Sequence, residues 1–191
     1  MRRMLPDPVV RMTQFYRAKE DGTQFHGSCG QTALAVCVGA ARGEPHDFEG
    51  IGELMITLTR DMIARGIAAP NGAATLAAYA QEAREIGCIV AAERRYHEPL
   101  DGWRDLLRTD AGIRPILLQV ANGEQLADAE TGARDETGLR YHAIAIVGVH
   151  DDAYLAVDGD NPEATRRFQM YALATLEAAR PCGLLILEMQ R

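Results

Sequence analysis

Three residues of this sequence have types and positions that could carry out covalent chemistry on a carbonyl group. Cys29 lies in "FHGSCGQTALAV", among small residues and at the expected start of a helix. A thiol in the first turn of a helix lies near unpaired backbone N–H groups, which favour its nucleophilic thiolate form. His142 lies near the start of the apolar run "HAIAIVGV", and Asp158 ends the next apolar run. A histidine can take the proton of such a cysteine while a carboxylate orients the ring.

Each of these residues also has a purely structural interpretation. Most unpaired cysteines are small buried hydrophobic residues, and an aspartate followed by glycine commonly begins a turn. Cys37 is the contrasting case, because it lies between valines in the middle of the same expected helix and is predicted to be inert core. The small neighbours Gly27, Ser28 and Gly30 set Cys29 apart, since they would let a substrate carbonyl approach closely.

The elements that must position these residues divide the chain into a helical half and a strand-rich half. Helical spacing of apolar residues, with glycine and proline as stop signals, predicts helices over 29–41, 48–66 and 73–87. Ser28 is the expected cap of the first helix. The second half predicts strands over 88–93, 114–121, 141–149, 153–159 and 182–189, with helices over 100–110 and 170–179. The polar, acidic stretch 121–138 is predicted to be a loop or flap.

The expected hairpin of 141–149 and 153–159 must have a particular register if His142 and Asp158 are to meet. Successive side chains alternate between the faces of a strand, so a plain two-residue turn at Asp151 and Asp152 would put the histidine and Asp158 on opposite faces. We therefore expect a loop of odd length, or a bulge, between Val149 and Leu155. The same geometry would bring the Cys29 sulfur within about 4 Å of a His142 ring nitrogen.

Composition excludes several classes of function. The 191 residues are 47% apolar, which predicts one domain over 1–191, with a helical half over about 1–87 and a sheet-rich half over about 88–191. The formal charge of −7 and the absence of a basic cluster argue against nucleic-acid binding. Prolines interrupt the positively charged N-terminal stretch "MRRMLPDPVV", and no segment approaches the length of a membrane span. We therefore expect a soluble protein without a signal peptide.

The chain predicts neither a metal site nor a cofactor. The four cysteines are scattered without CxxC spacing, which favours free thiols over a disulfide framework. His26 lies three residues before Cys29, but two further zinc ligands at suitable spacing are not evident nearby. His26 is expected to line a cleft or to face solvent. The aspartates around 151–160 lack the regular ligand spacing of a calcium loop, and turn chemistry explains them better.

Together, the Cys–Gly pair at a helix start, the glutamine before it, the "HAIAIVGV" strand and "YLAVDGDNP" resemble papain-like cysteine peptidases. Within that family the chain is most similar to the bacterial leader-processing (double-glycine) peptidases of bacteriocin exporters. The resemblance covers nearly the whole chain and implies an α+β, papain-like fold, in which an N-terminal helical lobe bearing the nucleophile helix packs on a C-terminal antiparallel sheet. It also implies that Cys29 is the nucleophile, His142 the general base and Asp158 the orienting acid.

By the same resemblance, the side-chain amide of Gln24 would donate to the oxyanion beside the Cys29 backbone N–H. Gln24 lies five residues before Cys29, where the family usually has six. Gln31, two residues after Cys29, is expected to point away from the site and to be structural. Asn161 is the alternative third member of the triad if Asp158 does not hold that position.

The function that the resemblance implies is cleavage of a peptide or amide bond by a cysteine nucleophile, without a cofactor. The substrate would be a peptide cut after small residues or a bacterial cell-wall peptide. Acyl transfer by the same residues is an alternative that the sequence does not separate from hydrolysis. A second alternative is a non-catalytic structural or binding protein that keeps the fold as a scaffold, with a partner in a protein assembly. The expected location is the cytoplasm or a phage particle.

Overall fold

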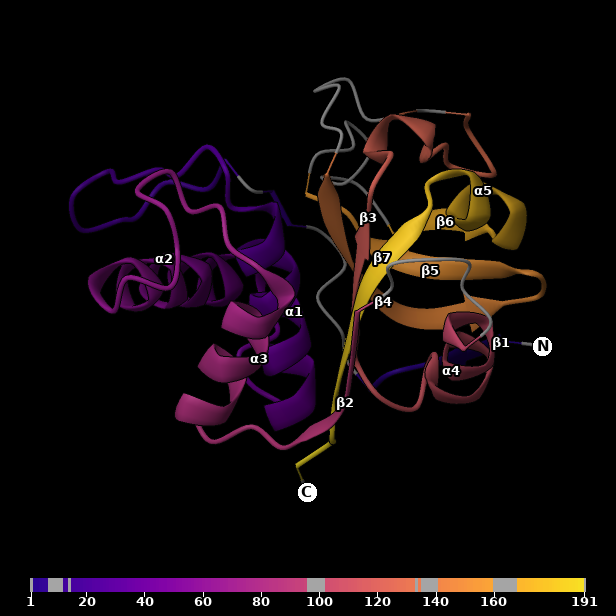
Figure 1. Cartoon of the computed structure of the whole chain (residues 1–191), viewed down its shortest axis with the longest axis horizontal. Helices are drawn as coiled ribbons and strands as arrows, with labels where there is room; N and C mark the ends of the chain where they lie inside the picture. Colours follow the sequence, from indigo (N-terminus) through magenta and orange to yellow (C-terminus); the bar gives the residue numbers. More distant parts are fainter. Residues whose placement is uncertain are drawn as a thin grey trace.

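Three helices form the first half of the chain, where the apolar spacing predicts them (Figure 1). They are α1 (Cys29–Arg42), α2 (Phe48–Ala64) and α3 (Leu76–Glu85). The computed structural model describes residues 2–6, 12–13, 15–95, 102–132, 134, 141–159 and 168–190. Gly43 ends α1 in the left-handed conformation, with φ 77°. Asp47 begins α2 as its side chain accepts a hydrogen bond from the Gly50 N–H at 2.6 Å.

Helix α1 is the central helix of this half. Its buried residues run without interruption from Gly30 to Ala41. A helix that is buried on all sides needs small and apolar residues around its whole circumference, and "GQTALAVCVGAA" supplies them. Helices α2 and α3 pack against α1 and the sheet covers its other side (Figure 1), so the first residue of α1 is held firmly relative to the strands.

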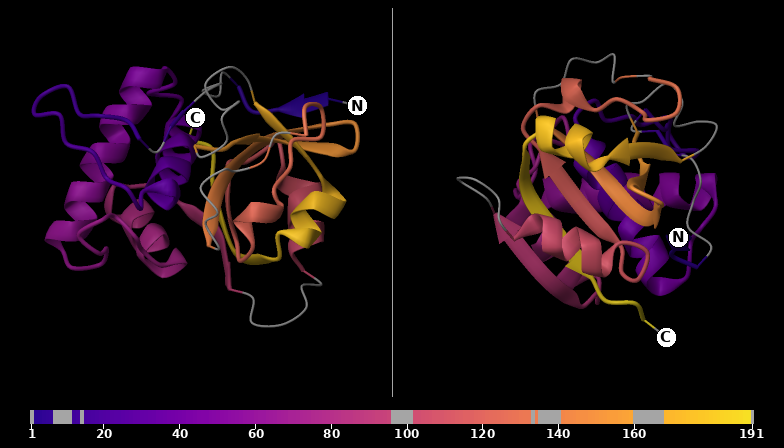
Figure 2. Two further views of the ribbon diagram at one scale, coloured as in Figure 1. Left: turned by 90° about the horizontal axis from the view of Figure 1, so that it is seen from above. Right: turned by 90° about the vertical axis from the view of Figure 1, so that its right-hand side faces the viewer.

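The described strands form a single seven-stranded sheet. They are β1 (Arg2–Met4), β2 (Val90–Arg95), β3 (Ile116–Val120), β4 (His142–His150), β5 (Ala153–Val157), β6 (Gln169–Ala172) and β7 (Pro181–Leu187). The order along the sheet is β2-β7-β3-β4-β5-β6, with β1 pairing β4 beyond the end of β3. All of these pairs are antiparallel. Figure 2 shows that the sheet is strongly curved.

Alternating strand residues divide the core between the two faces of the sheet. One set, which includes Leu117, Ala145 and Leu185, packs against α1, α2 and α3. The other set, which includes Leu118 and Ile144, packs against α4 (Trp103–Asp110) and α5 (Leu173–Ala178). Figure 1 accordingly shows α4 and α5 on the side of the sheet away from α1. The chain is therefore an α+β protein with a helical lobe on an antiparallel sheet, as predicted.

Three segments differ from their sequence-based predictions. Residues 169–172, predicted to lie mostly at the start of the last helix, form strand β6 beside β5, and α5 begins only at Leu173. Residues 2–4 form β1 and belong to the sheet, although they lie within the predicted helical half of about 1–87. The predicted loop 121–138 contains the short 3-10 helix η1 (Gly123–Gln125), and Leu126 and Asp128 within it are buried.

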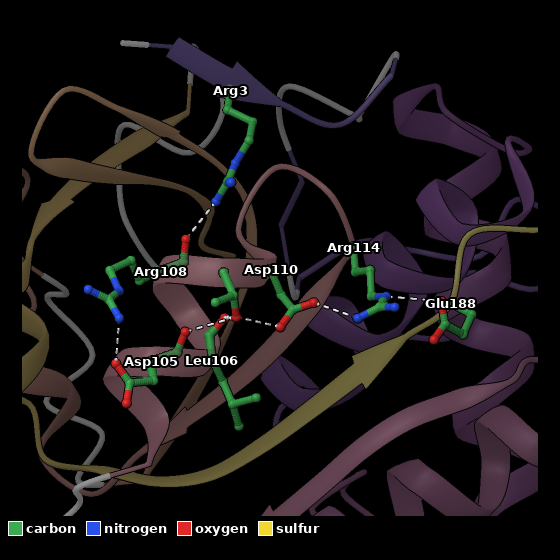
Figure 3. A network of polar contacts seen from close by, with 8 residues as sticks. Arg3, Asp105, Leu106, Arg108, Asp110, Arg114 and Glu188 are labelled. Carbon is green, nitrogen blue, oxygen red and sulfur yellow. Dashed lines mark hydrogen bonds and ion pairs between the residues drawn. The ribbon is translucent and has the colours of Figure 1, made fainter.

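A polar network anchors the part of the sheet around α4 (Figure 3). The Arg3 guanidinium donates hydrogen bonds to the backbone carbonyls of Arg108 at 2.8 Å and Ala111 at 2.6 Å, where α4 ends. Asp110 accepts from Arg114 at 2.7 Å, and Arg114 also donates to Glu188 at 2.9 Å. The network joins β1, α4 and the segment after β7. The hydrogen bonds of Arg3 therefore help to hold the short strand β1 in the sheet.

Among the described residues, none of the helices combines the length and the apolarity that a transmembrane crossing requires.

Candidate active site

Cys29 is the first residue of α1, as the sequence predicts, but the cap differs from expectation. Ser28 occupies the N-cap position, yet its side chain does not cap the helix. Its hydroxyl donates instead to the Phe25 carbonyl at 3.1 Å, and the side chain is fully buried. Ser28 therefore fixes the turn that leads into α1. Cys29 is partly exposed, whereas Cys37, further along the same helix, is 0% exposed.

The small residues around Cys29 make room for protein neighbours more than for a substrate. A Cβ built on Gly30 would lie 1.9 Å from the Tyr79 hydroxyl oxygen, so the Tyr79 ring from α3 occupies that space. Gly27 donates its N–H to the Asn71 carbonyl at 2.8 Å, and a Cβ there would lie 3.0 Å from the same oxygen. A cavity, described below, opens beside Cys29. Of Gly27, Ser28 and Gly30, only Gly27 is among the described residues that line it.

The β4–β5 hairpin reaches the required register by a bulge, although not where the sequence predicts it. The turn is the plain two-residue one, because His150 pairs with Ala153. The register then shifts between Ile146 and Gly148, so that Val147 is the extra residue. The expected odd loop or bulge between 149 and 155 is thus wrong in position, and the bulge lies earlier, in β4. Beyond it, position 145 pairs with 157, which puts positions 142 and 158 on the same face.

His142 and Asp158 form a buried pair at the ends of the two strands. The His142 Nε2 lies 2.8 Å from Asp158 Oδ1, and both side chains are 0% exposed. An ionised carboxylate can only accept, so Nε2 carries the proton in this contact. The second carboxylate oxygen, Oδ2, accepts a hydrogen bond from the Tyr171 hydroxyl at 2.5 Å. The backbone N–H of Asp158 donates to the Gln169 side chain at 3.3 Å. Strand β6 therefore holds Asp158 at two points.

The His142 ring also joins Asp158 to Cys29. Cys29 and His142 line the same cavity, and Cys29 is close enough to contribute to the electrostatics of the imidazole. Since Nε2 faces Asp158, Nδ1 is the ring nitrogen that remains for a proton exchange with Cys29. Burial alone would lower the pKa of His142, but the charge and hydrogen bond of Asp158, with a further contribution from Cys29, raise it well above its usual value. The structure thus joins His142, Asp158 and Tyr171 by hydrogen bonds, with Cys29 and His142 at the same cavity.

Cys29 and His142 face a cavity of about 680 Å³, which lies between the helical lobe and the ends of β3, β4 and β7. A volume of this size is within the usual range for ligand pockets, roughly 300–1,000 Å³. His26 was expected either to line a cleft or to face solvent. It is exposed and lines this cavity. The other lining residues are Gly27, Asn71, Ala73, Ala74, Thr75, Leu76, Tyr79, Gln119, Val120, Tyr141, Ala143 and Cys182.

The remaining predicted residues are placed as follows. Gln24 is half-buried on the segment before α1 and is not among the described residues that line the cavity. Gln31 is buried and donates its side-chain amide to the Gly72 carbonyl, which is the structural use expected of it. Asn161, the alternative to Asp158, lies outside the described residues. Gln119 and Asn71 carry the amide side chains that line the cavity.

The three other cysteines lie in environments that disfavour the thiolate. Burial raises the pKa of Cys37, of Cys88 and of Cys182, and for Cys88 the nearby Arg42 only partly offsets the effect. None of the four cysteines forms a disulfide. Within the described part of the chain, no group of three or more histidine, cysteine, aspartate and glutamate side chains is arranged to hold a metal ion.

Comparison with known proteins identifies the fold. No protein-family model matches the chain, and no curated protein sequence matches it. The structure is similar to that of a protein of Bacillus anthracis described as a C39-like peptidase, with a TM-score of 0.54, 11% sequence identity and 99% of each chain covered. The fold is papain-like. A Pseudomonas avirulence protein, AvrPphB, also matches, with a TM-score of 0.38, 12% identity, and 84% of this chain and 89% of the other covered.

Sequence reasoning missed several residues around this site. Tyr171 lies on β6, and its segment has good helix-forming residues, so no pattern placed it beside Asp158. Tyr79 sits on the predicted third helix, but only the contact with Gly30 shows that it lies beneath Cys29. Tyr141 immediately precedes His142, and at 71% exposure it is a large aromatic side chain at the cavity that adjacency to His142 could have suggested.

Proposed function

We propose that this chain is a cysteine peptidase or amidase in which Cys29 is the nucleophile, His142 the general base and acid, and Asp158 the residue that orients the imidazole. One observation carries the proposal. Cys29 at the start of α1 and His142 line the same cavity, Cys29 contributes to the electrostatics of the imidazole, and the His142 Nε2 lies 2.8 Å from Asp158 Oδ1. A packing cysteine has no need of a histidine and a carboxylate in line with it.

The reaction follows from that order of contacts. The Cys29 thiol gives its proton to Nδ1 of His142, the thiolate attacks the carbonyl carbon of the scissile amide, and the carbonyl oxygen becomes an oxyanion beside the start of α1. His142, protonated on both nitrogens, then gives the Nδ1 proton to the leaving amine as the C–N bond breaks, which leaves a thioester on Cys29. The neutral Nδ1 next takes a proton from water, and the resulting hydroxide equivalent displaces Cys29 and releases the acid.

The electrostatics of the pair suit this cycle. The raised pKa of His142 favours the doubly protonated ring that the acid of the first step requires. Asp158 compensates the charge of the buried imidazolium, which would otherwise be costly to keep away from water. For the oxyanion, the proposal assigns the Cys29 backbone N–H with the side-chain amide of Gln24, since the first N–H groups of a helix have no acceptor within it.

The proposed substrate is a peptide bond next to small residues or a bond in a bacterial cell-wall peptide. The cavity walls include Ala73, Ala74 and Ala143, and their short side chains support a substrate with small residues beside Cys29. A digest of mixed-sequence peptides and of purified peptidoglycan, followed by mass spectrometry of new termini, distinguishes the two substrates. New termini formed by the wild type and not by Cys29→Ala support the proposal.

Two results of that digest would count against it. Cleavage that persists in Cys29→Ala would remove Cys29 from the mechanism. No cleavage by the wild type of either substrate, together with tight capture of an intact peptide, would support the non-catalytic scaffold instead. Cys29→Ala is a suitable control because a small side chain in the first turn of a helix supports little packing.

A further inference from the structure

Asp158 has a second partner that the proposed cysteine–histidine–carboxylate mechanism does not use. The Tyr171 hydroxyl donates to Asp158 Oδ2 at 2.5 Å, while Oδ1 faces His142 at 2.8 Å. Tyr171 is 0% exposed and lies among the apolar residues on the α4 and α5 face of the sheet. A buried tyrosine hydroxyl usually forms a hydrogen bond with a nearby partner. Here the partner is the carboxylate that orients the histidine.

We propose that Tyr171 is a positioning residue, which acts through Asp158 to hold the His142 ring in line with Cys29 and to limit how tightly that ring keeps its proton. The inference rests on the proposed function, since it takes the roles of His142 and Asp158 from there. Tyr171 is not among the described residues that line the cavity, so it acts on the reacting atoms only through its neighbours.

The geometry explains why Asp158 needs a second anchor. Asp158 is the residue directly after β5, so its backbone is no longer held by the pairing of that strand with β4. The carboxylate could rotate about its side-chain bonds if only His142 held it. Tyr171 is part of β6, and it pairs with Tyr154 in the middle of the β5–β6 ladder, so its own position is fixed by the sheet. Because the sheet fixes Tyr171, the hydrogen bond from its hydroxyl also fixes the orientation of the Asp158 carboxylate.

The hydrogen bond also has a predictable electrostatic sign. A donor to a carboxylate stabilises its charge and makes the carboxylate a weaker acceptor for other protons. Without the Tyr171 hydroxyl, Asp158 would attract the Nε2 proton more strongly, and the pKa of His142 would rise further. A more basic imidazolium is a poorer acid for the leaving amine. Loss of the hydroxyl should therefore slow the step in which His142 gives up its proton.

The test is Tyr171→Phe, which removes the hydroxyl and keeps the ring. Histidine-labelled protein is titrated by NMR, with the His142 signals assigned from a His142→Gln variant. The expected result is a rise of about 0.5 pH unit in the His142 midpoint, since one hydrogen bond to a charged group is worth about one unit and only part of it reaches the ring. With a cleaved peptide in hand, kcat should fall about 10-fold and KM should stay within about twofold.

Tyr154→Phe is the matched control, because it makes the same change on the neighbouring strand. Tyr154 lies close to Arg3 and Arg108, in a separate groove away from Cys29. It should leave both the His142 midpoint and kcat unchanged. The proposal would be overturned if Tyr171→Phe were less stable but kept the His142 midpoint and the ratio of kcat to KM of the wild type. Tyr171 would then only pack.

Two further measurements keep the inference testable if Tyr171→Phe folds poorly. Tyr171→3-fluorotyrosine makes the phenol a stronger donor without removing it, so the His142 midpoint should fall instead of rising. In an Asp158→Asn background, the change at Tyr171 should no longer alter that midpoint. An unchanged midpoint in the fluorinated protein would contradict the proposal. Because these titrations need no substrate, they remain informative even if the wild type cleaves nothing and the proposed function fails.

Discussion

Gly30→Ala should destabilise this protein, although alanine is the better helix former. The added Cβ would lie 1.9 Å from the Tyr79 hydroxyl oxygen, 2.1 Å from Cζ and 2.6 Å from Cε2. Carbon atoms in contact are separated by about 3.5–4.0 Å, so the ring would have to move by more than 1 Å. Tyr79 has little room to do so, because it is 2% exposed.

The magnitude follows from two opposing terms. Overpacking of a core by one methyl group costs about 1–3 kcal/mol. Replacing glycine by alanine within a helix contributes about 1 kcal/mol in the other direction, and less in the first turn. The net loss should be about 1–2 kcal/mol, which corresponds to a lower Tm by about 2–8 °C for a chain of this length. Because Tyr79 and Cys29 line the same cavity, peptide cleavage should fall as well.

Thermal and urea unfolding measure this effect against two comparisons. Gly102→Ala is the control, since nothing lies within 4 Å of a Cβ built at Gly102 and its φ is negative, and it should change stability by less than about 0.5 kcal/mol. In a Tyr79→Leu background the cost of Gly30→Ala should shrink, because the ring that clashes is gone. If Gly30→Ala is as stable as the wild type or more so, the packing explanation of the Cys–Gly pair is refuted.

Three other predictions concern the residues around the site. Cys37→Ala should lower the free energy of unfolding by about 1–2 kcal/mol while leaving cleavage intact, because Cys37 is fully buried core away from the cavity; a loss of activity in a folded variant would contradict this. Asp158→Ala should lower kcat by roughly 10²-fold or more without abolishing turnover, since Cys29 and His142 can still meet while the ring is less well held. A silent Asp158→Ala together with a severe Asn161→Ala would mean that the third member is misassigned. The stability that His142 gains from Asp158 should depend on pH, because the pKa of His142 is raised on folding and the folded state therefore binds the proton more tightly. That contribution is complete below the unfolded-state pKa of about 6.5 and is lost as the pH rises through the folded-state pKa. The difference in unfolding free energy between wild type and Asp158→Asn should accordingly shrink from pH 6 toward alkaline pH, and a difference that grows instead would contradict the sign.

The parts of the fold that local patterns determine were predictable from the sequence. Helices α1, α2 and α3 fall on the predicted segments because apolar spacing and Gly43 act over a few residues. The pairing of β4 with β5 was predictable because the two apolar runs are separated by a short turn. The requirement that His142 and Asp158 meet predicted that both side chains lie on the same face of the sheet. The cause of this register, the bulge at Val147, lies within β4 and not in the turn, so the turn sequence did not reveal it.

The features that the sequence did not reveal depend on contacts between distant segments. Strand β6 forms because β5 offers it an edge, so pairing overrides the helical propensity of "MYALATLEAA". Strand β1 has three residues and is held by β4 and by Arg3 contacts to the end of α4. Tyr171 and Tyr79 join the site for the same reason, since each is brought to it by an element from elsewhere in the chain.

The rate at which each cysteine is alkylated at pH 6 tests the central claim most directly. Iodoacetamide labelling, resolved by peptide mapping, compares Cys29, paired with His142, with Cys37, Cys88 and Cys182, whose pKa values burial raises. We expect Cys29 to react at least about 10²-fold faster than the other three in the wild type, and to lose most of that advantage in His142→Ala. Equal and slow labelling of all four cysteines, or an undiminished Cys29 rate without His142, would contradict the account.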